Sequence, residues 1–187
     1  DAAEAGWTSL FDGKSTAAWR CYNQKEIPPG VWAVEEGALK TVPGAKDHCD
    51  LITRDKYRDF ELELEWKVSP GGNSGVLYRV AELPPPSETW HSGPEMQILD
   101  DERHKDGKDR RTSAGALYAL VAPQDKTLLP PGQWNKAGVL VRGNHVEHWL
   151  NGKMILEYEL GSPTLQAPIA QSKFKDMPRF AREAEGH

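Results

Sequence analysis

The run DFELELEWKVS, residues 59–69, constrains the fold more than any other stretch of the chain. Its apolar side chains alternate with charged ones, and they are Phe60, Leu62, Leu64, Trp66 and Val68. Successive side chains of a β-strand point to opposite faces of the sheet, so this alternation indicates a half-buried strand. The run therefore predicts a sheet with one face in a core and one acidic face in water. Glu65 is the last carboxylate of that face, and it either stays solvated or reaches a functional site.

Other segments carry strand and turn signals of the same kind. Residues 31–42 (VWAVEEGALKTV) predict a hairpin around Glu-Gly, and residues 114–123 (AGALYALVAP) predict a further strand. Residues 133–160 predict three strands with turns at Gly143-Asn144 and at Asn151-Gly152, whereas residues 161–187 are predicted to be irregular. Many short strands at this spacing are typical of an antiparallel sandwich or jelly roll. Without repeats or a linker, residues 1–187 are predicted to form a single all-β domain.

Composition restricts the partners. The formal net charge of -5 argues against a nucleic-acid partner, and no apolar run approaches the roughly 20 residues of a membrane span. Seven Trp and five Tyr suit either a sugar-binding surface or a sandwich core. The chain starts at Asp1 without Met, as expected of a processed or trimmed form. Cys21 and Cys49 predict either one disulfide or two buried thiols.

The candidate functional face comes from NSGVLYRVAELPPPSETWHSGPEMQILDD, residues 73–101. It contains two predicted strands, 75–80 and 94–99, joined by a proline-rich loop. If these strands are neighbours, Arg79, Glu95 and Gln97 converge on one open surface. Since Gln97 is an amide, a glycosidase with two carboxylates would need its second carboxylate from elsewhere. Alternatively, Arg79 neutralises Glu95 and the pair is structural.

The remaining motifs leave alternatives open, and neither a metal nor a cofactor is expected. The sequence has no Gly-rich phosphate loop, no Gly-x-Ser-x-Gly elbow and no cluster at zinc spacing. His145 and His148 are three residues apart and point to opposite faces of a strand. His148 is either a packed, hydrogen-bonded core histidine or a group at the rim of a cleft, suited there to proton transfer. The acidic residues 100–102 either hold a hard cation or form an ion-free loop.

The chain resembles the 3-keto-disaccharide hydrolase family in a series of motifs that run in order over nearly its whole length: GWTSLFDGKS, DFELELEWKV, GGNSGVLYR, SGPEMQILDD, AGALY, QWNKAGVLVRGNHVEHWLNGK and SKF. The resemblance implies a concanavalin A-like jelly roll of the lectin/glucanase type, made of two antiparallel sheets. It also implies that the family's last C-terminal strand, which follows the Gly186-His187 seen here, is missing. Members are typically exported, so the resemblance implies a periplasmic or secreted protein and favours the disulfide.

The implied activity is cleavage of an oxidised glucoside or disaccharide that carries a ketone at C3. The ketone acidifies the hydrogen on C2, so that elimination of the C1 substituent and then hydration amount to hydrolysis. Glu95 and His148 are the expected base and acid, in an order that the sequence does not assign. Arg79 and Gln97 are the expected clamp for the enolate and hydroxyls.

Further candidates surround this expected site. Asp100, Lys173 and Glu65 are additional binding residues, and Trp90 with His91 is expected to form a lid or a sugar platform. Two other readings of the same jelly roll remain. One is a carbohydrate-binding, lectin-like module without catalysis. The other is a conventional glucanase-type glycosidase, whose retaining version needs two carboxylates about 5–5.5 Å apart.

Overall fold

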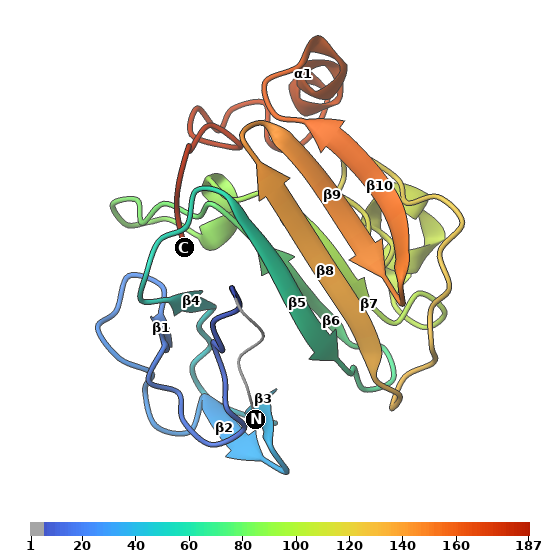
Figure 1. The fold of residues 1–187 in the computed structure, drawn as a ribbon. Coiled ribbons are helices and arrows are strands. Elements are labelled where there is room, and N and C mark those ends of the chain that lie inside the picture. Colours follow the sequence, from blue (N-terminus) through green and yellow to red (C-terminus); the bar gives the residue numbers. More distant parts are fainter. Residues whose placement is uncertain (1–5) are drawn as a thin grey trace. The chain divides into compact units, whose positions relative to one another are not determined.

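The structure is a computed structural model that describes residues 6–187, and it consists of two compact units (Figure 1). Unit 1 comprises the described part of Asp1–Lys56, together with Glu82–Thr89 and His187. Unit 2 comprises Tyr57–Ala81 and Trp90–Gly186. The single domain predicted over residues 1–187 stays a prediction.

Unit 1 contains two antiparallel strand pairs. Strand β1 (Trp19–Cys21) pairs with β4 (Leu51–Thr53), and β2 (Trp32–Glu35) pairs with β3 (Ala38–Thr41). The β2–β3 turn has positive φ at both central residues, 52° at Glu36 and 76° at Gly37. Two left-handed residues in succession give the turn whose twist matches that of paired strands. The hairpin predicted at residues 31–42 is confirmed.

A disulfide joins Cys21 at the end of β1 to Cys49, with the two Cα atoms 5.6 Å apart and a sequence separation of 28 residues. Cys21 is fully buried, and the indole N–H of Trp32 donates to the Cys49 carbonyl at 3.0 Å. Closing a loop of this length stabilises a fold by about 3–4 kcal/mol in the chain-entropy description. The disulfide is therefore the main covalent constraint on unit 1, and the expected pairing of the two cysteines is confirmed.

Unit 2 is an antiparallel sandwich. One layer has the strand order β10-β9-β8-β5, and the other contains the pair β6-β7 (Figure 1). The predicted strands of residues 59–69 and 133–160 are confirmed, as are the turns between them. Their bounds are β5 (Phe60–Trp66), β6 (Asn73–Leu77), β7 (Glu95–Leu99), β8 (Asn135–Arg142), β9 (His145–Leu150) and β10 (Lys153–Glu159).

The core of unit 2 lies between the two layers. Val139 and Val146 from the four-stranded sheet pack in one apolar cluster with Met96 and Ile98 of β7. Fully burying an aliphatic side chain of this size stabilises the fold by roughly 1.5–3 kcal/mol. Trp66 is buried and the other apolar side chains of β5 are partly buried, while its glutamates are exposed. The alternation in the sequence therefore has the predicted consequence, and the all-β, two-sheet antiparallel jelly-roll class is confirmed.

Two segments differ from the sequence-based expectation. Residues 114–121 contain turns and isolated bridges instead of a strand, because Gly115 (φ 83°) and Ala119 (φ 63°) are left-handed and interrupt an extended chain. The C-terminal region contains a helix, α1 (Pro163–Ala170), capped by the Ser162 hydroxyl, which accepts from the Leu165 N–H. Ser followed by Pro is the usual start of a helix, so this signal was present in the sequence.

Three short 3-10 helices complete the described elements: η1 (Thr89–His91), η2 (Lys105–Lys108) and η3 (Arg110–Thr112). Among residues 6–187, no helix has the length and apolar character needed to cross a membrane.

Candidate active site

Strands β6 and β7 are neighbours, as expected, but Arg79 does not join Glu95. Strand β6 ends at Leu77, and the left-handed backbone at Arg79 (φ 51°) turns the chain away from the strand direction. The guanidinium donates to the Arg58 carbonyl at 2.7 and 3.0 Å and to the Gly143 carbonyl at 2.8 Å, and its side chain is almost fully buried. Arg79 thus links the backbone at Arg58 to the turn at Gly143. The expected convergence of Arg79 with Glu95 and Gln97 is absent.

Glu95 lies half-buried at the start of β7, opposite Leu77 of β6. Its carboxylate extends over the neighbouring Gly75, where a Cβ atom would lie 1.9 Å from Glu95 Oε1. Only glycine leaves room for the carboxylate in this position. The Glu95 carbonyl also accepts a hydrogen bond from the Tyr118 N–H at 2.9 Å. That bond places the segment carrying Tyr118 against the β7 edge.

Lys173 extends its amine over three aromatic rings. Its Nζ atom lies 4.8 Å from the ring centroid of Trp90, 4.5 Å from that of Tyr118 and 5.1 Å from that of Phe174. Partial burial lowers the pKa of Lys173, and the nearby carboxylates of Glu95 and Asp106 oppose this effect. The side chain as a whole remains exposed, so a solute can reach the amine.

Tyr118 and Asp106 form a hydrogen-bonded pair beside the amine. The Tyr118 hydroxyl donates to Asp106 Oδ2 at 3.1 Å. Burial, followed by the carboxylate of Asp106, raises the pKa of Tyr118 to about 12, so the phenol is protonated at neutral pH. We call Glu95, Asp106, Tyr118 and Lys173 the Glu95–Lys173 cluster. It combines two carboxylates, a phenol and an amine.

Gln97 and Asp100 are near this cluster in sequence but are buried. Gln97 is only 1% exposed, and its Nε2 donates to the Thr112 carbonyl at 3.3 Å. The Asp100 carboxylate accepts from the Gly71 N–H at 2.7 Å and from the Glu102 N–H at 3.2 Å. These hydrogen bonds hold the pKa of Asp100 below its usual value. Asp100 therefore stabilises its loop, and neither side chain is displayed at the surface.

His148 is a packed, hydrogen-bonded histidine, which is one of the two alternatives left by the sequence. It is fully buried, with Nδ1 3.0 Å from the Gly115 carbonyl and Nε2 2.8 Å from the Tyr78 hydroxyl. Because a carbonyl only accepts, Nδ1 carries the proton and Nε2 accepts from Tyr78. Burial lowers the pKa of His148 to about 4, with the Gly115 hydrogen bond opposing it. The imidazole is therefore neutral and lies inside the sandwich.

Of the residues predicted from the sequence, the structure thus brings together Glu95, Lys173 and Trp90, with the His91 ring 4.3 Å from that of Trp90. Glu65 is exposed opposite Lys136, on the outer face of the four-stranded sheet. Sequence reasoning missed Tyr118 and Asp106. Tyr118 stands in the AGALY motif, which was predicted to be a strand, and Asp106 stands in the charged run ERHKDGKDRR, which carries no catalytic motif.

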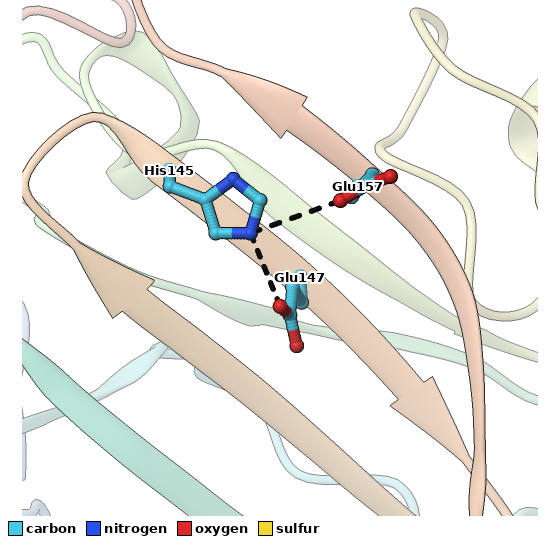
Figure 2. Close-up of side chains that lie close together, drawn as sticks. All are labelled: His145, Glu147 and Glu157. Atoms are coloured by element: carbon cyan, nitrogen blue, oxygen red, sulfur yellow. Dashed lines mark hydrogen bonds and ion pairs between the residues drawn. The ribbon is translucent and has the colours of Figure 1, made fainter.

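Two other clusters bear on cation binding. His145, Glu147 and Glu157 offer ligand atoms within 4.8 Å of one another on β9 and β10 (Figure 2). Hydrogen bonds from the His145 ring to the carboxylates of Glu147 and Glu159 raise the pKa of His145, so the same arrangement favours an ion-pairing histidine without a metal. In the acidic loop, the Lys126 ammonium donates to Asp101 Oδ2 at 2.6 Å, and the Asp100 carboxylate accepts from the Gly71 N–H at 2.7 Å.

A separate cleft of about 580 Å³ lies in unit 1. Its guanidinium groups are already paired, Arg20 with Glu82 and Arg54 with Glu26, each at 2.6 Å. The cleft is wide and polar, and we assign it no chemistry.

The position of the Glu95 carboxylate gives a first test of the site. Gly75→Ala should reduce activity by about 10–100-fold, because the new methyl group displaces the carboxylate by more than an ångström. Stability should hardly change, since Gly75 is in a strand and its φ is not left-handed. Gly138→Ala on β8 is the matched control, because its Cβ would lie 3.4 Å from its nearest neighbours. Activity assays and thermal unfolding of both variants test this prediction. Equal activity of the two variants would contradict the position of the Glu95 carboxylate over Gly75.

The sandwich of unit 2 belongs to a glycosyl-hydrolase-like fold class, as two solved structures show. A crystal structure of a proposed glycosyl hydrolase from Parabacteroides distasonis matches with a TM-score of 0.86 and 31% identity, over 96% of this chain and 83% of that chain. A second such structure from the same species matches with a TM-score of 0.63 and 32% identity, over 76% of this chain and 72% of that chain.

Residues 6–185 match the family described as the 3-keto-alpha-glucoside-1,2-lyase-like domain, so the chain belongs to this family. A curated 3-keto-disaccharide hydrolase from Bacteroides thetaiotaomicron is 34% identical over 186 residues, which cover 90% of this chain. The chain spans 64% of the length of that relative. The resemblance inferred from the sequence motifs is thereby confirmed.

Proposed function

We propose that this chain cleaves glycosides whose sugar carries a ketone at C3, by elimination followed by hydration. The observation that carries the proposal is that Glu95 and the Lys173 amine both border Tyr118, where the carboxylate attracts the ammonium, within a chain that belongs to the lyase-like family. A carboxylate can remove a proton, and an adjacent cation can take up the charge that this removal creates. The named activity of the curated relative, a 3-keto-disaccharide hydrolase, supports the same chemistry.

The proposed reaction starts at C2 of the sugar. Glu95 removes the C2 hydrogen, and the electron pair moves toward the C3 carbonyl, where Lys173 stabilises the resulting charge. The C1 substituent then leaves with its bonding electrons and forms a C1–C2 double bond conjugated to the carbonyl. Water adds at C1 and a proton returns to C2, so the net change is hydrolysis. A positioned base typically contributes about 10²–10⁴-fold to such a reaction.

Tyr118 is the proposed acid for the leaving group. Its raised pKa of about 12 keeps the phenol protonated at neutral pH. The hydroxyl can turn from Asp106 to the departing oxygen, and Asp106 positions it for this step. His148 has no place in the proposed transfer, because its ring is enclosed in the core and its pKa is lowered to about 4.

The substrate is proposed to be an oxidised glucoside or disaccharide. Trp90, whose ring borders the Lys173 amine, offers a flat apolar face on which a sugar can stack. A periplasmic or secreted location is supported by the Cys21–Cys49 disulfide, because disulfides persist in oxidising compartments.

The test compares a 3-keto-glucoside with its unoxidised parent, both carrying a chromogenic leaving group. Release is expected from the keto substrate alone, because only the ketone acidifies the C2 hydrogen. Equal cleavage of both substrates would instead support a conventional glycosidase that uses Glu95 and Asp106. Binding of either sugar without any release would support a lectin-like module.

A further inference from the structure

The Lys173 amine is unusual in what surrounds it. Its nitrogen faces the rings of Trp90, Tyr118 and Phe174, and among the described residues the structure gives this nitrogen neither a hydrogen bond nor an ion pair. The half-buried Lys126 ammonium, by contrast, donates to Asp101, Ser113 and Ala114. Lys173 is thus held in place by ring faces and not by acceptors.

This environment increases the fraction of Lys173 that is present as the neutral amine. An ammonium has three N–H donors, and ring faces that replace part of the surrounding water without accepting hydrogen bonds penalise the charged form. The penalty lowers the pKa of Lys173 despite the attraction of Glu95 and Asp106. A lysine desolvated against apolar groups is the usual form of an amine nucleophile that attacks a carbonyl.

We propose that Lys173 forms an iminium with the C3 ketone of the substrate before Glu95 removes the C2 hydrogen. This inference rests on the proposed function and specifies how the charge from C2 is taken up. The neutral Lys173 amine attacks C3, and the carbonyl oxygen leaves as water after accepting one proton from that nitrogen and one from solvent. A carbon–nitrogen double bond forms, and the nitrogen keeps one hydrogen and a positive charge. Removal of the C2 hydrogen then sends its electron pair to the nitrogen, giving an enamine.

The remaining steps restore the amine. The enamine pair expels the C1 substituent and forms a conjugated, unsaturated iminium. Water attacks C3 of this iminium, the carbon–nitrogen bond breaks, and the ketone and the Lys173 amine are regenerated. Iminium formation releases one water and hydrolysis of the unsaturated iminium consumes one. The later addition of water at C1 makes the net change a hydrolysis, and no oxidant or reductant is needed. The iminium carries a positive charge on the same nitrogen, so the faces of Trp90 and Tyr118, which bind a cation, also stabilise the iminium.

The experiment traps this iminium in the folded chain. The protein is incubated with an aryl 3-keto-glucoside and sodium cyanoborohydride, and its intact mass is measured before peptide mapping. The expected result is a covalent sugar adduct on Lys173. In Glu95→Gln the adduct should accumulate with its aryl group still attached, because elimination is blocked after the iminium has formed.

Two arginine variants separate covalent from purely electrostatic roles. Lys173→Arg keeps the positive charge but cannot form an iminium, so the adduct should vanish and release of the aryl group should fall by about 10²-fold or more. Lys175→Arg, on the exposed lysine two residues away, is the matched control and should keep both adduct and rate.

Two outcomes overturn the iminium while leaving the proposed function intact. One is release from the keto substrate with no adduct on Lys173 at any reductant concentration. The other is a Lys173→Arg variant that keeps its activity, which would make the side chain a simple charge. Absence of any release from the keto substrate in the unmodified protein would overturn the iminium together with the proposed function.

Discussion

Replacing Glu95 by Gln is expected to lower turnover of a 3-keto-glucoside by about 10²-fold or more. The amide is nearly the same size as the carboxylate and still fits over Gly75, so the change removes the base and leaves the packing intact. Steady-state release of a chromogenic leaving group measures the loss, and kcat should fall more than KM changes.

Glu65→Gln is the control for this variant. Glu65 is also a strand glutamate, but it is exposed on the outer face of β5, away from the Glu95–Lys173 cluster. Its replacement should leave turnover unchanged. A Glu95→Gln protein with full activity, or an equal loss in both variants, would remove Glu95 from the reaction.

Acidification should destabilise unit 2 through His148. Its pKa is lowered from 6.5 to about 4 in the folded state, because the buried imidazole resists protonation. The stabilisation is therefore fully present above pH 6.5 and is lost as the pH falls toward 4, where the unfolded chain takes up a proton that the folded chain does not. A pKa lowered from 6.5 to about 4 corresponds to about 3 kcal/mol.

Denaturant unfolding between pH 7.5 and 4.5 measures this effect in the unmodified protein and in His148→Gln. The variant should be less stable at pH 7.5, because it disturbs the hydrogen bonds to Tyr78 and Gly115. Its stability should depend less on pH, because it carries no titrating group at this position. His145, whose pKa is raised, contributes with the opposite sign in both proteins and cancels in their difference. Identical pH dependence of both would contradict a neutral, buried His148.

The strand pattern was predictable because it depends on local alternation. In β5, every second residue is apolar, so the sequence itself indicates which side chains face the core. The Glu36-Gly37 turn, with two left-handed residues, specifies the β2–β3 hairpin. The 114–121 segment was not predictable in this way. Its apolar residues resemble a strand, but the left-handed conformation of Ala119 is imposed by tertiary contacts that a sequence does not display.

The candidate site was only partly predictable for a similar reason. Alternation placed Glu95 and Gln97 on one face, yet it could not show that other segments cover Gln97. Tyr118 and Lys173 are 55 positions apart in the sequence and meet only because the chain folds back past β7. A single left-handed residue redirected Arg79, and such a residue is rare outside glycine and hard to foresee.

The most direct measurement follows the hydrogen at C2. A 3-keto-glucoside labelled with deuterium at C2 is cleaved in ordinary water, and the sugar product is analysed by mass spectrometry at early times, against a sample without protein that corrects for spontaneous exchange. Removal of this hydrogen by Glu95 predicts that the product has lost its deuterium, whether it is recovered as the unsaturated ketone or as the hydrated sugar. A product that retains the deuterium at C2 would show that the bond at C1 breaks directly, and would contradict elimination.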